Sequence, residues 1–208
     1  MVGCGGSDPM DYHALEAMQC MIERRKGGET GVKQVQMIEG DDVWKALDEG
    51  RFSRRLLEAA LSRSDTPCGK TDEDGRTQDL LGNGELPILV DKPAAYFIEH
   101  NDGLKTTLLM LNGAIKDFCF ACEADGEIVS TQFFLSPTPN VTYSACLVAT
   151  MEEMIDTGTA PFPAERTLIV SGALESCLTS KVEDHKKLET PHLSVLYEAP
   201  EESHHAHF

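Results

Sequence analysis

The sequence has little positive charge. It carries 18 Lys and Arg residues against 35 Asp and Glu, which gives a formal net charge of −17 over 208 residues. A surface this acidic repels phosphate backbones and anionic lipid head groups. We therefore expect neither a nucleic acid nor a membrane surface as a partner.

The sequence also lacks long hydrophobic runs and the marks of export. No run approaches the roughly 18 apolar residues of a membrane span, and the first residues do not show the basic-then-apolar order of a signal peptide. The seven cysteines, an odd number, are scattered along the chain, which favours reduced thiols over a disulfide framework. We expect a cytoplasmic protein, with no glycosylation at the Asn140-Val141-Thr142 sequon.

The composition of the chain and the distribution of its loop-forming residues predict one domain. Apolar residues make up 41% of the chain, an ordinary share for a globular protein. We expect a single domain over residues 1–200 and a frayed tail over 201–208. Residues 65–93 are rich in Asp, Gly, Thr and Pro and show little periodicity, which predicts a long loop or an insertion within that domain.

The spacing of apolar residues predicts an α+β fold. Asp8 and Pro9 suit the N-cap and first position of a helix that runs to about Arg24. Further helices are expected over 41–47, 53–63, 141–156 and 164–179. Strands are expected over 32–38, 95–99, 104–111, 118–122, 128–135 and 192–197. The turns Asn101-Asp102-Gly103 and Asp125-Gly126 predict two hairpins, and hence a mostly antiparallel sheet.

The strand expected over 104–111 is apolar on both faces, with Leu108 and Met110 on one side and Leu109 and Leu111 on the other. Both faces of such a sheet must be covered. We expect helices on one face and the other face available for oligomerisation.

The best candidate site residues are Asp8, Asp11 and His13 at the start of the first helix. Two interpretations stay open. In one, both aspartates cap the helix and His13 is a partly exposed first-turn residue. In the other, Asp8 and Asp11 bind a substrate and His13 contacts its hydroxyl as a neutral imidazole, since the helix N-terminus disfavours imidazolium. A divalent-metal site from the same three residues lacks a second cluster of ligands.

Two other sequence patterns are excluded as functional sites on chemical grounds. Gly3-Cys4-Gly5-Gly6 resembles a dinucleotide fingerprint, but Asp8 stands where the third glycine belongs and would repel a pyrophosphate. Cys119 and Cys122 form a CxxC pattern within a predicted strand, where they would point to opposite faces and pack in the core. No nucleophile elbow, HExxH or phosphate-binding loop is present.

Three stretches in order resemble the C-terminal domain of the glucose–fructose oxidoreductase / inositol dehydrogenase (Gfo/Idh/MocA) family. They are the glycine-rich run from Gly5 through His13 to Glu16, the stretch 96–113 with its Asp-Gly hairpin, and the helix–proline turn–helix stretch from Met151 to Ser180. The family's aspartate normally stands four residues before the histidine, where this chain has Pro9. Asp91-Lys92-Pro93 is similar to a family motif that belongs in the cofactor domain, so we give it no role.

The resemblance implies that His13 is the active-site histidine of an NAD(P)-dependent oxidoreductase. The cofactor would be bound by a Rossmann domain that this chain does not contain, so the chain alone is expected to be inactive. We expect a substrate-binding and oligomerisation domain whose small-molecule substrate is a sugar, a polyol or a related hydroxyl compound. The alternative is a non-catalytic, homo-oligomeric binding or assembly module. Neither implies a metal or a cofactor-binding residue within the chain.

Overall fold

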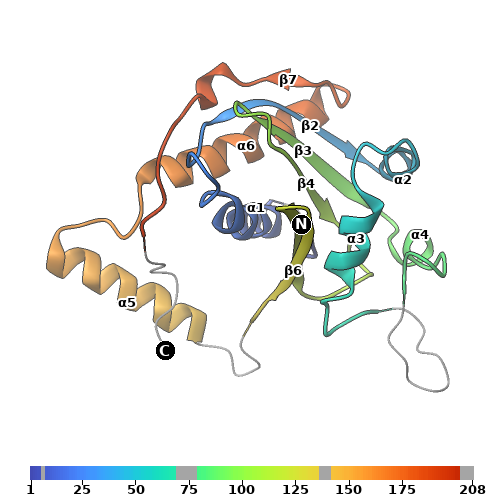
Figure 1. Cartoon of the computed structure of the whole chain (residues 1–208), viewed down its shortest axis with the longest axis horizontal. Coiled ribbons are helices and arrows are strands. Elements are labelled where there is room, and N and C mark those ends of the chain that lie inside the picture. The colour runs from blue at the N-terminus through green and yellow to red at the C-terminus, as the bar shows by residue number, and fades with distance from the viewer. Residues whose placement is uncertain (6–7, 69–78, 136–141, 202–208) are drawn as a thin grey trace.

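The computed structural model describes residues 1–5, 8–68, 79–135 and 142–201 (Figure 1). Within these ranges the α-helices are α1 (Pro9–Ile22), α2 (Asp41–Asp48), α3 (Arg54–Leu61), α4 (Leu86–Leu89), α5 (Thr142–Thr157) and α6 (Ala164–Val182). The strands are β1 (Val2–Gly3), β2 (Val32–Glu39), β3 (Ala94–His100), β4 (Lys105–Met110), β5 (Phe118–Ala124), β6 (Glu127–Phe133) and β7 (Leu188–Glu189). Asn140 and Val141 of the sequon and nearly all of the predicted tail lie outside the described residues.

The strands form one sheet in the order β6-β5-β1-β4-β3-β2-β7. Only β1 and β4 pair in parallel, and every other neighbouring pair is antiparallel. Both predicted hairpins are present, β3–β4 around Asp102 and β5–β6 around Asp125. The α+β class and the mostly antiparallel sheet are therefore confirmed.

Helices cover both faces of this sheet, which differs from the expectation of a free second face. On the first face α1 and α6 build a core with Tyr96 and Leu108. On the second face α2, α3 and α4 build another core with Leu109 and Cys119. Figure 1 shows α1 and α6 on one side of the strands and α2–α4 on the other. The second face is covered because the short helices carry stripes of apolar side chains, such as Val43 of α2, that pack in the second core.

Three local predictions were incomplete or wrong. Strand β1 was not predicted, although its Val2 is buried in the middle of the sheet. The strand predicted over 192–197 is wrong: a 3₁₀ helix occupies Pro191–Leu193, and only Tyr197 bridges to Glu29. The segment expected as a loop over 65–93 contributes its described part to the second core through α4 and the buried Leu80 and Leu81; residues 69–78 lie outside the described ranges.

Helix α5 differs from the other helices because none of its residues is buried. Figure 1 shows it projecting away from the sheet, connected to α6 through the proline turn. Among the helices that the structure describes, none is both long enough and apolar enough to cross a membrane.

Candidate functional site

The turn between β1 and α1 lies at the carboxyl ends of the two parallel strands, β1 and β4. Gly5 has a φ of 121°, and a Cβ at this position would lie 2.3 Å from Cγ of Met10, so only glycine fits. The Gly5 amide donates a hydrogen bond to Oδ1 of Asn112, which follows β4. The carboxyl ends of strands are frequent ligand sites in sheets that carry parallel pairs, so we take this edge as the candidate site.

Asp8 and Asp11 form the capping box that the sequence predicted. Asp8 is the N-cap of α1, with a φ of 65°, and its amide donates to Oδ2 of Asp11 at 3.0 Å. The Asp11 side chain is directed into the protein, where Tyr96 Oη donates to the same oxygen at 2.7 Å. Burial and the Asp11 carboxylate raise the pKa of Tyr96 above its usual range, so this phenol stays protonated. Asp11 therefore links the start of α1 to β3.

His13 lies on the exposed side of α1, and its ring centre is 6.1 Å from the ring centre of Tyr12 in an edge-to-face arrangement. The three predicted residues therefore do not converge: Asp11 is buried against β3, whereas Asp8 and His13 face solvent. Within the described ranges, no group of three His, Cys, Asp or Glu side chains is arranged to hold a metal ion.

Cys4 adds a thiol to this edge but not a reactive one. Burial raises its pKa, and the negative charge of Asp117 raises it further. Burial alone would raise the pKa of Asp117 too, but hydrogen bonds from Ser64, Gln132 and Thr66 hold it below its ordinary value. A protonated thiol is a poor nucleophile, so this edge offers polar binding groups rather than thiolate chemistry.

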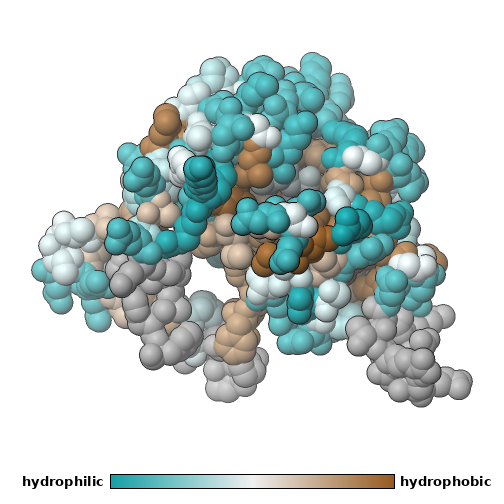
Figure 2. All heavy atoms as spheres, in the orientation of Figure 1, coloured by the Kyte–Doolittle hydropathy of each residue, from teal (hydrophilic) through white to brown (hydrophobic). Residues whose placement is uncertain are grey.

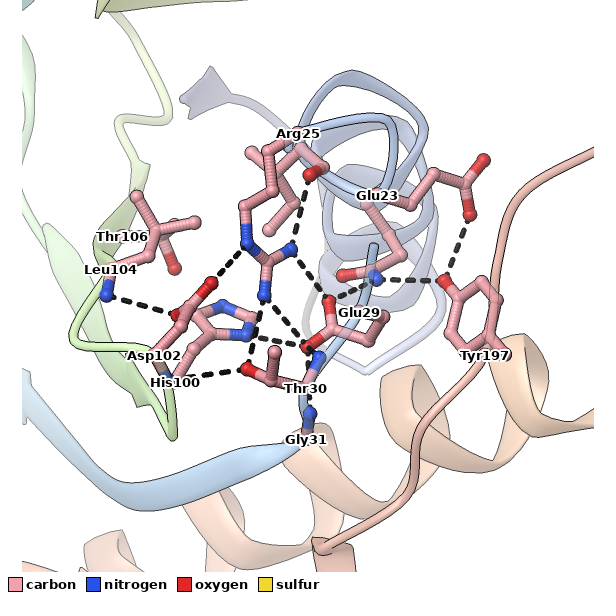
Figure 3. Close-up of polar contacts among 12 residues, drawn as sticks. Glu23, Arg25, Glu29, Thr30, Gly31, His100, Asp102, Leu104, Thr106 and Tyr197 are labelled. Carbon is pink, nitrogen blue, oxygen red and sulfur yellow. Dashed lines mark hydrogen bonds and ion pairs between the residues drawn. The ribbon is translucent and has the colours of Figure 1, made fainter. Parts of the chain in front are cut away.

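A second polar cluster lies at the opposite end of α1 and centres on Glu29 (Figure 3). The Glu29 side chain is fully buried and pairs with Arg25 through two contacts of 3.0 Å and with Nδ1 of His100 at 3.0 Å. Gln19 donates to the same carboxylate at 2.8 Å, and the amides of residues 30 and 31 donate at 2.9 Å. Although burial opposes it, these partners lower the pKa of Glu29 far below its usual range.

The cluster continues through Tyr197 to Arg166 in α6. Tyr197 Oη donates to Glu23 at 2.8 Å and accepts from Gln19 at 2.8 Å. Arg166 donates to Glu23 at 2.9 Å and also pairs with Glu16. The guanidinium is buried, and its partners raise its pKa despite that burial. These contacts join α1, α6, the β3–β4 hairpin and the C-terminal segment, so the cluster is a structural clamp whose centre, at Glu29, is closed to solvent.

Sequence patterns did not predict this cluster, although one signal was present. Arg166 stands on the same helical stripe as Ile169, Val170 and Ala173, all of which are buried. A charged residue on a buried stripe needs partners of opposite charge, and that would have predicted a buried ion pair. No local signal identifies Glu29 or His100, because their pairing joins residues 71 positions apart.

The candidate edge does not fit a dinucleotide. The carboxylates of Asp8 and Asp11 stand at the helix N-terminus, where a pyrophosphate would need amide donors and no negative charge. No family model, curated protein or solved structure matches this chain. The oxidoreductase interpretation therefore stays a prediction at this point.

Proposed function

We propose that this chain is the substrate-binding and oligomerisation domain of an NAD(P)-dependent oxidoreductase that acts on a sugar, a polyol or a related hydroxyl compound. Because the candidate edge at the start of α1 does not fit a dinucleotide, the cofactor would be held by a domain outside these 208 residues. The contribution of this chain is then to bind and orient the substrate.

The main support for this proposal is that His13 is exposed near the start of α1, where a capping box holds the first turn of the helix. The capping box fixes the first turn of α1, and the hydrogen bond from Tyr96 ties that turn to the sheet. His13, two residues after Asp11, is exposed in this fixed frame. An imidazole can donate a hydrogen bond to a hydroxyl group or accept one from it, which is the contact that a polyol substrate requires. The carboxylate of Asp8, which is also exposed, can accept a hydrogen bond from a second hydroxyl group.

Assembly into a homo-oligomer is supported by apolar surface on α5. Large apolar side chains of this helix are 42–76% exposed. They are Tyr143, Leu147, Val148, Met151, Met154 and Ile155. Contiguous exposed apolar patches mark interaction surfaces in many proteins. The cytoplasmic location belongs to the same proposal, because no disulfide joins any of the seven cysteines, all of which lie in described residues.

Titration calorimetry with a panel of hexoses, pentoses and cyclic polyols tests the proposal. We expect at least one class of compound to bind, and His13→Ala to weaken binding about fivefold, since one hydrogen bond contributes about 1 kcal/mol. His192→Ala is the matched control, because His192 is also exposed and follows β7, away from α1. If His13→Ala leaves every affinity unchanged, the alternative of a non-catalytic assembly module is favoured.

Nucleotide fluorescence tests the proposal that the cofactor is bound by another domain. We expect no change in NADH or NADPH fluorescence on adding this chain, because Asp8 and Asp11 place carboxylates at the glycine-rich start of α1. Saturable binding of either nucleotide would contradict this division of roles. Light scattering during gel filtration tests the assembly part, which predicts a mass above the 22.8 kDa of one chain.

A further inference from the structure

The central sheet is interrupted beside β1. This strand has two residues, and its Val2 pairs with Leu109 of β4 on one side and Cys119 of β5 on the other. Beyond β1, strand β4 extends back to Lys105 and β5 extends on to Ala124. Their outer edges pair with β3 and β6. Their inner edges beyond β1 have no described strand between them.

A cavity of about 470 Å³ occupies this interruption. Its lining includes Met18 and Ile22 from α1 on the first face of the sheet, and Phe52 and Leu57 on the second face. A cavity lined from both faces of a sheet is a gap in the sheet itself. Figure 2 shows apolar side chains at the surface in the region where Figure 1 marks the N-terminus.

The register of β1 shows what would fill the gap. Three positions added before Met1 in line with β1 would lie opposite residues 105–107 of β4, since Val2 lies opposite Leu109 and the pairing is parallel. They would lie opposite residues 121–123 of β5, since Val2 also lies opposite Cys119 and that pairing is antiparallel. All six of these residues line the cavity. Strands on either side of a third stand about 9–10 Å apart, which is the spacing expected of β4 and β5 where β1 pairs with both of them.

The amino nitrogen of Met1 continues the parallel pairing of β1 with β4. It donates to the carbonyl oxygen of Thr107 at 3.0 Å, as a peptide N–H in a parallel ladder would. Burial lowers the pKa of this amino group to about 5. An ammonium group has three donors to satisfy, whereas a peptide N–H has one. The surroundings of this nitrogen therefore suit a peptide bond better than a charge.

We propose that this gap is a strand site, filled by an extended polypeptide segment joined to the amino nitrogen of Met1. The segment runs parallel to β4 and antiparallel to β5. Met1 packs in the first core and Val2 in the second, so side chains before Met1 alternate between the cores. The first and third face Phe52 and Leu57, and the second faces Met18. Apolar, β-branched residues suit all three positions. This inference does not depend on the proposed function.

Two matched variants of the whole chain test the proposal, one carrying Val-Val-Val and the other Val-Pro-Val before Met1. Proline has no N–H and is not tolerated inside a central strand. Hydrogen exchange by mass spectrometry reports on the β4 and β5 amides. We expect exchange in peptides covering 105–107 and 121–123 to be about tenfold slower with Val-Val-Val than with Val-Pro-Val or with no extension.

Equal exchange in all three proteins would overturn the strand site. A separate acetylated Val-Val-Val amide, added to the unextended chain, distinguishes the source of the strand. We expect this free peptide to protect neither segment at micromolar concentration. Protection by the free peptide equal to that by the extension would overturn the covalent arrangement and assign the site to a separate chain. Because neither measurement involves a sugar or His13, failure here is distinguishable from failure of the proposed function.

Discussion

Replacing Glu29 with glutamine tests the clamp at the end of α1. The carboxylate accepts hydrogen bonds from Gln19, from Arg25 twice, from His100 and from the amides of residues 30 and 31. The glutamine amide offers one oxygen and places an NH₂ group against these donors. Removing one partner of a buried ion pair costs about 3–5 kcal/mol. Folded domains have about 5–15 kcal/mol of stability in total, so the variant should be severely destabilised.

Urea denaturation at pH 7, followed by the fluorescence of the single tryptophan, Trp44, measures the change. The matched control is Glu99→Gln, which removes a partly exposed carboxylate that pairs with Lys33 at the surface. We expect this control to denature at nearly the wild-type urea concentration, because surface ion pairs contribute little. A Glu29→Gln protein within about 1 kcal/mol of wild type would refute the idea that the clamp depends on this charge.

The pH dependence supplies a second check on the same residue. The partners of Glu29 lower its pKa in the folded protein below its ordinary value of 4.5. The charge therefore stabilises the fold fully above pH 4.5, and this contribution is lost as the pH falls below that value. The difference in stability between wild type and Glu29→Gln should shrink as the pH is lowered from 5 to 3. A constant difference over that range would contradict the assignment.

Two further predictions concern buried groups. Tyr96→Phe removes the donor to Asp11 and should lower the stability by about 1–3 kcal/mol in thermal unfolding; an unchanged midpoint would show that Asp11 does not need this partner. Burial raises the pKa of Cys177 to about 12, so its alkylation at pH 8 should be about three orders of magnitude slower than that of a free thiol with a pKa near 8.5. Mass spectrometry of the labelled peptides measures this rate, and rapid labelling would contradict the burial of the thiol.

Local signals predicted the elements whose determinants are close together in the chain. Both hairpins followed from their turn residues, and α3 begins at the Ser53 cap within one residue of the prediction. The CxxC interpretation is also confirmed, since Cys119 lies in the second core and Cys122 packs against the first. In each case the information lies within a few residues, where turn and capping chemistry act.

The remaining features depend on contacts between distant segments. Strand β1 is too short for a periodic pattern, and only its pairing with β4 and β5, more than 100 residues away, defines it. The segment predicted as the last strand instead packs Leu193 against Gly172 of α6, and Thr190, just before that segment, donates to the carbonyl oxygen of Val32 in β2. The two interpretations of Asp11 could not be separated from sequence, because its partner Tyr96 lies 85 positions away.

The central claim is that His13 contacts a hydroxyl compound at the start of α1. Nitrogen-15 NMR of the histidine side chains, during titration with the tightest-binding sugar or polyol, tests it directly. We predict saturable shifts of the His13 ring nitrogens, with the resonances of His192 unmoved. Binding that leaves the His13 resonances in place, or the absence of binding by any sugar or polyol, would contradict the claim.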